Sequence, residues 1–222
     1  MTTTLSEQQL TAEFTVKDLD GRWRSPVAAE VFPGIYGIDD FWLRSPFWGI
    51  HFSSYKDQGC QERLFELIIS GMFYLLEPST EVAGARNVNF SRVITCLRLH
   101  DPALVDQANA EGDGKWRPRE WRNASAGGCH LIDLPGTDEC PIEYDLLGLA
   151  RSTSSTNVDK LFFGQRQHDE TGSIWTRRAP GLLDYYVVRY ESTAPAVGHG
   201  GGWGPEQWTR VTTFPALFSE DT

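Results

Sequence analysis

Two short strand-like runs separated by a polar turn most constrain how this chain can fold. The first run covers residues 142–148 and the second covers residues 160–166, with Ser, Thr and Asn prominent in the segment 151–157 between them. Two such runs joined by a polar turn are typical of a β-hairpin. Similar runs recur along most of the chain, so the sequence predicts an all-β fold, a single antiparallel β-barrel. A closed barrel offers its mouth and interior as the natural place for function.

Alternating side chains along further runs favour the same fold. Residues 47–56 have an apolar face of Trp48, Ile50 and Phe52 and a more polar face of His51, Ser53 and Tyr55, as the two-residue period of a strand requires. Residues 64–77 are largely apolar on both faces, which indicates a strand covered on both sides, with a helix as the rival interpretation. Gly71 in the middle of this run favours a bend at a barrel corner. Residues 88–100 alternate as one further strand.

The chain is predicted to have three parts: a lead-in at residues 1–20, a barrel domain at residues 21–190 and a tail containing Gly and Trp at residues 191–222. One β-rich domain of this size is common. The capping-box spacing of Ser6 and Gln9 predicts a short helix over about residues 7–14. Within the barrel domain we expect a short helix near 101–110, a long loop over 110–128 and a strand at 129–134. The aromatic residues of the tail suggest that it docks on the protein.

Charge and hydropathy exclude several classes of function. The formal net charge is -10 and the isoelectric point is about 4.9. An acidic surface repels both phosphate backbones and anionic bilayers, so nucleic-acid binding and membrane docking are not expected. No run of about 18 apolar residues occurs, so no transmembrane helix is expected. The first residues lack the basic and apolar segments of a signal peptide, which predicts a cytoplasmic location.

The cysteines and histidines match no metal-binding motif. The four cysteines, Cys60, Cys96, Cys129 and Cys140, lack Cys-x-x-Cys spacing, and the five histidines lack His-x-x-x-His spacing. We therefore expect no metal and no cofactor, although a site assembled from distant strands stays open. A reducing compartment would keep the cysteines as thiols, with one disulfide or one reactive cysteine as alternatives. No phosphate loop and no Gly-x-Ser-x-Gly elbow occurs.

A series of soft motifs occurs in the order found in one known domain family. They are Gly21-Arg22-Trp23-Arg24-Ser25, Glu30-Val31, Phe41-x-Leu43, Trp48, Tyr55-x-Asp57-x-x-Cys60, Phe65-x-Leu67-x-x-x-Gly71-x-Phe73, Val82-x-Gly84, Gly128-Cys129-x-Leu131, Glu143-Tyr144-Asp145-Leu146 and Leu161-Phe162-Phe163-Gly164-Gln165-Arg166. Over about residues 21–190 the chain resembles the adenomatosis polyposis coli down-regulated domain. Its Gly-x-Trp start is also similar to that of lipocalin-like barrels, in which the Trp plugs one end.

The resemblance implies a lipocalin-like barrel with a hydrophobic cavity that accepts lipid. Known members of the family are animal Wnt antagonists with two such domains, which lie outside the cell and are tethered to a membrane. Here we expect a single lone domain without a signal peptide. Ala29 stands where members of the family carry a cysteine. We therefore expect the fold to carry over, rather than the family's disulfide pattern or its Wnt role.

The polar face of residues 47–56 supplies the candidate catalytic pair, His51 and Glu66. In an apolar interior both groups would have shifted pKa values and could move protons; the structural alternative is that they face water. The candidate ligand-binding residues are Trp48, Tyr55, Tyr74, Tyr144, Gln165 and Arg166. Arg166 could hold a carboxylate or carbonyl group of a ligand. Alternatively, Arg166 could stack on Trp23 and help to plug the barrel.

These features predict a β-barrel that binds a hydrophobic or amphipathic small molecule in its interior. The alternative is a cofactor-free cyclase or isomerase that acts on a polyketide- or terpenoid-like biosynthetic intermediate, by holding a reactive conformer and transferring protons. A protein-interaction module is a third hypothesis, which rests on the analogy with Wnt antagonists. The expected partner is a small-molecule ligand or substrate, and the sequence leaves a homodimer open.

Overall fold

The described part of the chain is almost entirely β-structure. The computed structural model describes residues 10–112, 115–152, 158–165 and 181–190. Three of the predicted features lie outside these ranges: the start of the helix at 7–14, the residue Arg166 and the tail 191–222. In chain order, the elements are α1 (Val16–Leu19), β1 (Gly21–Arg24), β2 (Ala29–Phe32), β3 (Ile35–Arg44), β4 (Phe47–Tyr55), β5 (Arg63–Pro78), β6 (Ala85–Ser91), β7 (Ile94–Leu99), α2 (Pro102–Ala110), β8 (Arg122–Asn123), η2 (His130–Ile132), β9 (Ile142–Ala150), β10 (Lys160–Phe163) and β11 (Val187–Arg189).

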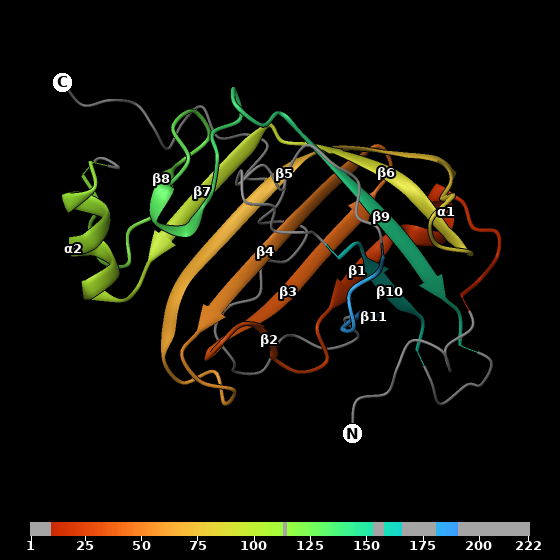
Figure 1. Cartoon of the computed structure of the whole chain (residues 1–222), viewed down its shortest axis with the longest axis horizontal. Coiled ribbons are helices and arrows are strands. Elements are labelled where there is room, and N and C mark those ends of the chain that lie inside the picture. Colours follow the sequence, from red (N-terminus) through yellow and green to blue (C-terminus); the bar gives the residue numbers. More distant parts are fainter. Residues whose placement is uncertain (1–9, 113–114, 153–157, 166–180, 191–222) are drawn as a thin grey trace. The chain divides into compact units, whose positions relative to one another are not determined.

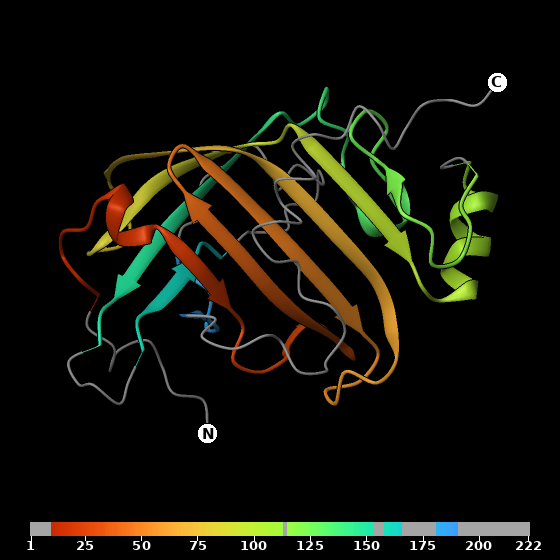
Figure 2. The same cartoon turned by 180° about the vertical axis from the view of Figure 1, so that it is seen from behind.

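Eight of these strands close into a barrel (Figure 1). Going around the wall, β3, β4, β5, β6, β9, β10, β11 and β1 each pair antiparallel with the next, and β1 returns to β3. Strand β2 adds to β3, while β7 and β8 continue the sheet beyond β5. Figure 2 shows β7, β8 and α2 to one side of the barrel strands. The predicted all-β fold with a single antiparallel barrel is confirmed.

Strand β5 belongs both to the barrel and to its extension. One edge pairs with β4 over Arg63–Met72, and the other pairs with β7 over Phe65–Ser70 and with β6 over Phe73–Pro78. Gly71 lies between these two halves. A Cβ atom there would sit 1.9 Å from the backbone oxygen of Ser91, so the crossing chain leaves no room for a side chain. The run predicted at 64–77 is therefore a strand that bends, and the rival helix does not form.

The single strand predicted over residues 88–100 is in fact two strands, β6 and β7. The break falls at Arg92 and Val93, where the backbone N–H groups donate to Pro141 (2.8 Å) and Ser70 (2.9 Å). The Arg92 side chain is fully buried and lies near Glu143. At this break the chain leaves the barrel wall and enters the extension, and the inward face passes from Val88 and Phe90 to Leu97 and Leu99. One two-residue period over the whole run cannot reveal this change of face.

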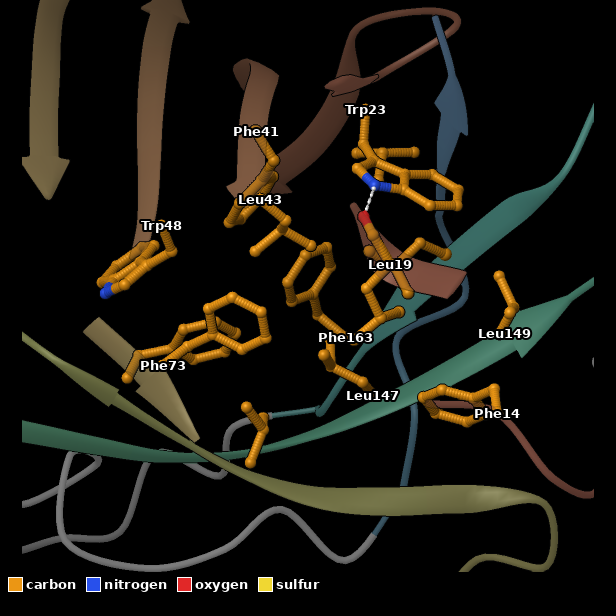
Figure 3. Close-up of a cluster of buried hydrophobic side chains, with 14 of the residues drawn as sticks. Phe14, Leu19, Trp23, Phe41, Leu43, Trp48, Phe73, Leu147, Leu149 and Phe163 are labelled. Carbon is orange, nitrogen blue, oxygen red and sulfur yellow. Dashed lines mark hydrogen bonds between the residues drawn. The ribbon is translucent and has the colours of Figure 1, made fainter. Parts of the chain in front are cut away.

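The main hydrophobic core lies inside the barrel (Figure 3). Its members alternate along the strands, so that one face of each strand points inward. The inward side chains include Trp23, Phe41, Leu43, Trp48, Phe73, Leu147, Leu149 and Phe163. The rings of Phe41 and Phe163 stack with their centroids 4.2 Å apart, which joins opposite parts of the wall.

Trp23 plugs the end of the barrel next to α1. It is fully buried, and its indole N–H donates to the backbone oxygen of Leu19 at 2.8 Å. The guanidinium of Arg189 lies 4.2 Å from the centre of the Trp23 ring and donates to the backbone oxygens of Asp18 and Asp20. An arginine thus stacks on Trp23 as in lipocalin-like barrels, but the residue in the described structure is Arg189 on β11.

The N-terminal segment differs from its prediction. Residues 10–14 are not helical, and in the described structure the helical turn next to them is α1 at Val16–Leu19. The N–H of Thr11 donates to Leu149 at 2.7 Å, and Phe14 is buried in the core. An extended lead-in therefore lets this segment pack along the barrel wall. The turn begins where the Asp18 carboxylate accepts hydrogen bonds from the backbone N–H and the hydroxyl of Thr15, at 2.7 and 3.0 Å.

A second, smaller core joins the extension to the barrel. The helix α2, predicted near 101–110, packs against β7, and Trp116 from the long loop is buried in the same cluster. The strand predicted at 129–134 is instead the tight turn η2, closed by reciprocal backbone hydrogen bonds between Cys129 and Leu134. Among the residues described, no helix is long and apolar enough to cross a membrane.

The close approach at Gly71 makes this residue a sensitive test of the bend. Substitution Gly71→Ala should lower the free energy of unfolding by about 1–3 kcal/mol, because the new methyl group meets a backbone atom that cannot move freely. Urea denaturation measures this change. Gly127→Ala is the control, since a Cβ atom there meets nothing within 4 Å. Equal stability of the two variants would contradict the packing described here.

Candidate functional site

The predicted catalytic residues His51 and Glu66 lie together on the outer wall of the barrel. His51 on β4 is opposite Ile68 on β5, and Ser53 is opposite Glu66, so all four share one face. Their neighbours Trp48 and Ile50 point the other way, into the core. Of the two alternatives that the sequence left open, the interior and the water-facing surface, the structure matches neither fully: these groups lie on the outer face but are buried there. A two-residue period shows which side chains share a face of a strand, but it does not show which of the two faces turns inward.

The Glu66 carboxylate is the centre of a cluster of four basic side chains. One oxygen, Oε1, lies 3.1 Å from His51 Nε2 and 3.0 Å from Arg63 Nη1. The other oxygen, Oε2, accepts from Arg98 Nε at 2.8 Å and lies 2.5 Å from His100 Nε2. A carboxylate only accepts hydrogen bonds, so both imidazoles must carry their proton on Nε2. Here we call these five residues the Glu66 cluster.

A β-bulge brings Arg63 into this cluster. Ser54 is opposite Phe65, but Tyr55 is opposite Arg63, so Leu64 is the extra residue on β5. Without a bulge, Arg63 and Glu66 would lie on opposite faces, because they are three residues apart. With it, Arg63 turns outward, where its guanidinium also donates to the hydroxyl of Tyr55 at 3.1 Å.

Aromatic side chains cover the cluster and exclude water from it. The Arg98 guanidinium lies 4.4 Å from the centre of the Trp121 ring, and the His51 ring is 6.3 Å from the same indole. Glu66 is 2% exposed as a result. A buried carboxylate is stable only when its partners replace the lost water, and here two guanidinium groups and two imidazoles do so.

The surroundings set the charge of the cluster. Burial alone would raise the pKa of Glu66, but the hydrogen bonds from His51 and His100 and the charges of Arg98 and Arg63 outweigh it and hold the pKa far below its ordinary value. Burial also lowers the pKa of His100, more than the contact with Glu66 raises it. At neutral pH the site therefore contains an ionised carboxylate and a neutral His100. The predicted role of Glu66 as a proton donor would need the opposite shift.

The inner face of β4 and β5 is apolar and partly accessible. Ile50, Phe52, Phe65 and Leu67 point inward, yet each keeps part of its surface accessible. On the outer face of the same strands, His51, Ser53 and Glu66 are buried. The wall thus has its charged groups covered outside and accessible apolar surface inside. Gly37 on β3 leaves space for the Phe52 ring, which would lie 2.5 Å from a Cβ atom there.

The six predicted ligand-binding residues are not brought together. Trp48 points into the core, where its indole N–H donates to Ser91 at 2.8 Å. Tyr55 lies on the outer wall beside Arg63, whereas Tyr74 and Tyr144 are exposed, each opposite Asn89 on the outer surface. Gln165 is exposed after β10, and Arg166 lies outside the described residues. Their predicted roles in binding stay predictions.

Several charged residues near these sites were missed by reasoning from sequence. Arg63, Arg98 and His100 join Glu66, but only the unpredicted pairing of β5 with β7 brings the last two close. Asp145 and Glu143 are also buried, on the inward side of β9. Asp145 accepts hydrogen bonds from the backbone N–H groups of Leu146 and Gly164, at 2.7 and 2.9 Å. A same-face spacing of two residues was the available signal for Arg98 and His100.

The cysteines give no sign of a reactive site. All four lie in the described part of the chain and are present as thiols. Burial raises the pKa of both Cys60 and Cys96, which opposes formation of a thiolate. Within the described ranges, no group of three or more His, Cys, Asp or Glu side chains is arranged to hold a metal ion.

No protein-family model matches the chain, and none of the curated proteins matches it. The class of the protein therefore rests on its own structure, which is a closed eight-stranded antiparallel β-barrel with a buried charge cluster on its outer wall.

Removal of the central charge should destabilise the fold. Glu66→Gln should lower the free energy of unfolding at pH 7 by about 3–5 kcal/mol, because two guanidinium groups lose their buried counter-charge. Urea denaturation at several pH values measures this effect. Because the pKa of Glu66 is lowered in the folded state, its contribution is complete above the ordinary carboxylate pKa of about 4.3 and is lost as the pH falls below it. The difference between wild type and variant should therefore shrink in acid.

Glu120→Gln provides the matched control. The Glu120 side chain is 62% exposed and lies 3.8 Å from Arg117, so the same substitution should change stability by less than about 0.5 kcal/mol. A Glu66→Gln variant as stable as this control would contradict a structural role for the cluster.

Proposed function

We propose that this barrel binds a hydrophobic or amphipathic small molecule against the inner face of β4 and β5. The observation that carries this proposal is the accessible apolar surface of Ile50, Phe52, Phe65 and Leu67, all of which point inward. Apolar surface that faces the interior and still contacts water is what a hydrophobic ligand would cover. Each Å² that it covers contributes about 25 cal/mol.

The two aromatic rings of this wall favour a ligand with a flat or extended apolar part. The rings of Phe52 and Phe65 have their centroids 5.8 Å apart and are inclined at 49°. Such a pair presents a ring face and a ring edge, both of which pack well against hydrocarbon or aromatic groups. Gly37, which is opposite Ser54, leaves room for the Phe52 ring, because a Cβ atom there would lie 2.5 Å from it.

A polar group beside the rings would suit an amphipathic ligand. Asp39 on β3 is directly opposite Phe52 and therefore lies on the same inner face. Its backbone N–H donates to the hydroxyl of Ser25 at 3.0 Å, which fixes this part of β3. One carboxylate next to a mainly apolar wall is the usual composition of a small-molecule site.

The resemblance to the adenomatosis polyposis coli down-regulated domain supports the same proposal, because that family is expected to accept lipid in its barrel. The cyclase or isomerase alternative gains less support. His51 and Glu66, the two groups predicted to transfer protons, lie on the far side of the wall from the apolar surface. Binding is therefore the function that we propose.

The proposal predicts that Phe52→Ala weakens the binding of a neutral fluorescent probe, N-phenyl-1-naphthylamine, by about five- to tenfold, because the ligand loses one aromatic contact. Fluorescence titration of the purified protein measures the dissociation constant. Before the titration, native mass spectrometry should detect any molecule that copurifies, and extraction with solvent would identify it.

The matched control is Phe47→Ala, which makes the same truncation on the same strand. Phe47 points outward and is 51% exposed, so its loss should leave probe affinity unchanged. Failure of the folded wild-type protein to bind the probe would overturn the proposal. So would an equal loss of affinity in the two variants.

A further inference from the structure

A hollow lies beside the Glu66 cluster and includes Arg63 and His100 in its lining. It has a volume of about 350 Å³ and is lined by residues from the β4–β5 turn, the β7–α2 junction and the segment before β8. Its charged lining residues are Lys56, Glu62, Arg63, His100, Asp101 and Arg119. None of the inner-wall residues Ile50, Phe52, Phe65 and Leu67 lines this hollow, so an inference about it does not depend on the proposed function.

The rim of this pocket is held by backbone hydrogen bonds. The N–H groups of His100 and Asp101 both donate to the oxygen of Leu64, the extra residue of the β-bulge, at 2.7 and 3.2 Å. The N–H of Arg119 donates to Leu99 at 2.7 Å, and that of Lys56 donates to Glu62 at 2.9 Å. The backbone atoms from which the charged side chains extend are therefore fixed, and this lowers the entropy cost of binding a ligand.

The charges of the pocket leave a positive excess on an acidic protein. Lys56, Arg63 and Arg119 give three positive charges, against two negative charges from Glu62 and Asp101, so the lining carries a formal charge of +1 with His100 neutral. The whole chain carries -10. Asp101 is already engaged, since its carboxylate bonds to Lys56 and accepts from the N–H of Ala103 at the start of α2.

Two groups in the pocket have unused hydrogen-bonding capacity. The Arg119 side chain is exposed and makes no ion pair or hydrogen bond within the described ranges. His100 donates to Glu66 through Nε2, so Nδ1 is the remaining ring nitrogen. The side chain of His100 is 16% exposed. Arg63 is held beside them by Glu66 and Tyr55.

We infer that this pocket binds the phosphate or carboxylate group of a small anion, between Arg119, Arg63 and His100. Guanidinium groups match oxyanions in charge and geometry, and each can donate two hydrogen bonds to one anion. Arg63 donates to the anion from a fixed position, whereas the exposed Arg119 side chain contacts the anion from the solvent side. Glu66 neutralises part of the charge of Arg63 and Arg98, which allows several cations to lie close together without an anion present.

His100 should make this binding dependent on pH. The charged groups around its ring are Glu66 and Arg63 from β5, Arg98 from β7, and Lys56, Glu62, Asp101 and Arg119 along the pocket. Burial lowers its pKa, so the ring is neutral near pH 7 and gains a proton only in mild acid. A protonated ring adds a positive charge and a second donor, so anion binding should strengthen as the pH falls.

NMR titration of the ¹⁵N-labelled full chain with inorganic phosphate, and separately with malonate, tests the inference. Saturable shifts are expected at the backbone amides of Gln61, Glu62 and Ala103, and the tighter anion identifies the preferred class. Arg119→Gln should weaken binding about tenfold, the value of one charge-assisted hydrogen bond. Arg117→Gln changes the same charge two residues away, on a side chain that is 76% exposed and outside the pocket, and should leave affinity unchanged.

The pH test uses inorganic sulfate, whose charge is constant over the range of interest. In the wild type, affinity should rise as the pH falls below about 6.5, the ordinary pKa of histidine, because His100 takes up a proton there. His100→Gln should remove this rise and leave a pH-independent affinity. Absence of saturable shifts would overturn the inference, as would equal weakening by Arg119→Gln and Arg117→Gln, which would indicate unspecific attraction to surface charge.

Discussion

The barrel depends on a very short seam between its first and last strands. In the described structure β1 and β11 are in register only at Trp23 with Arg189 and at Arg24 with Val188. Backbone pairing of this length is weak without support from side chains. Arg189 supplies that support, because its guanidinium stacks on Trp23, donates to the backbone before β1 and pairs with Asp159 at 3.2 Å. Trp23, which plugs the barrel, is therefore also the residue on which Arg189 packs to hold the closure of the barrel.

At β4 and β5 the polar outer face of the wall is itself covered. Trp121 lies over Arg98 and near His51 on this face, and the Glu66 cluster supplies the hydrogen bonds that the burial demands. The helix α2 packs on the other face of β7, against Leu97 and Leu99. On that same inner face of the sheet, Phe65 and Leu67 pack against this second core and still keep part of their surface accessible. The two candidate sites therefore border β5 on its two faces.

The sequence was sufficient to predict the fold class because the strand runs, their turns and the Gly-x-Trp start all indicate the same architecture. The close pairing of His51 with Glu66 also followed from adjacent strands. The direction in which that pair points did not, since both faces of 64–77 are apolar and the covering segment comes from distant residues. Arg98 and His100 were missed for a related reason: they belong to a strand that seemed continuous with β6, although the chain leaves the barrel at Arg92.

The β-bulge at Leu64 has a consequence for both surfaces of the wall. One additional residue changes the face on which every preceding side chain of the strand lies. If β4 and β5 paired without the bulge, Leu64 would lie opposite Tyr55, and Arg63 would turn from the outer cluster toward the inner face, on the side of Phe52 and Phe65. Glu66 would lose a guanidinium partner, and the apolar wall would gain an unpaired cation. The bulge at this one position therefore keeps a charged surface and an apolar surface apart, on the two faces of a single sheet.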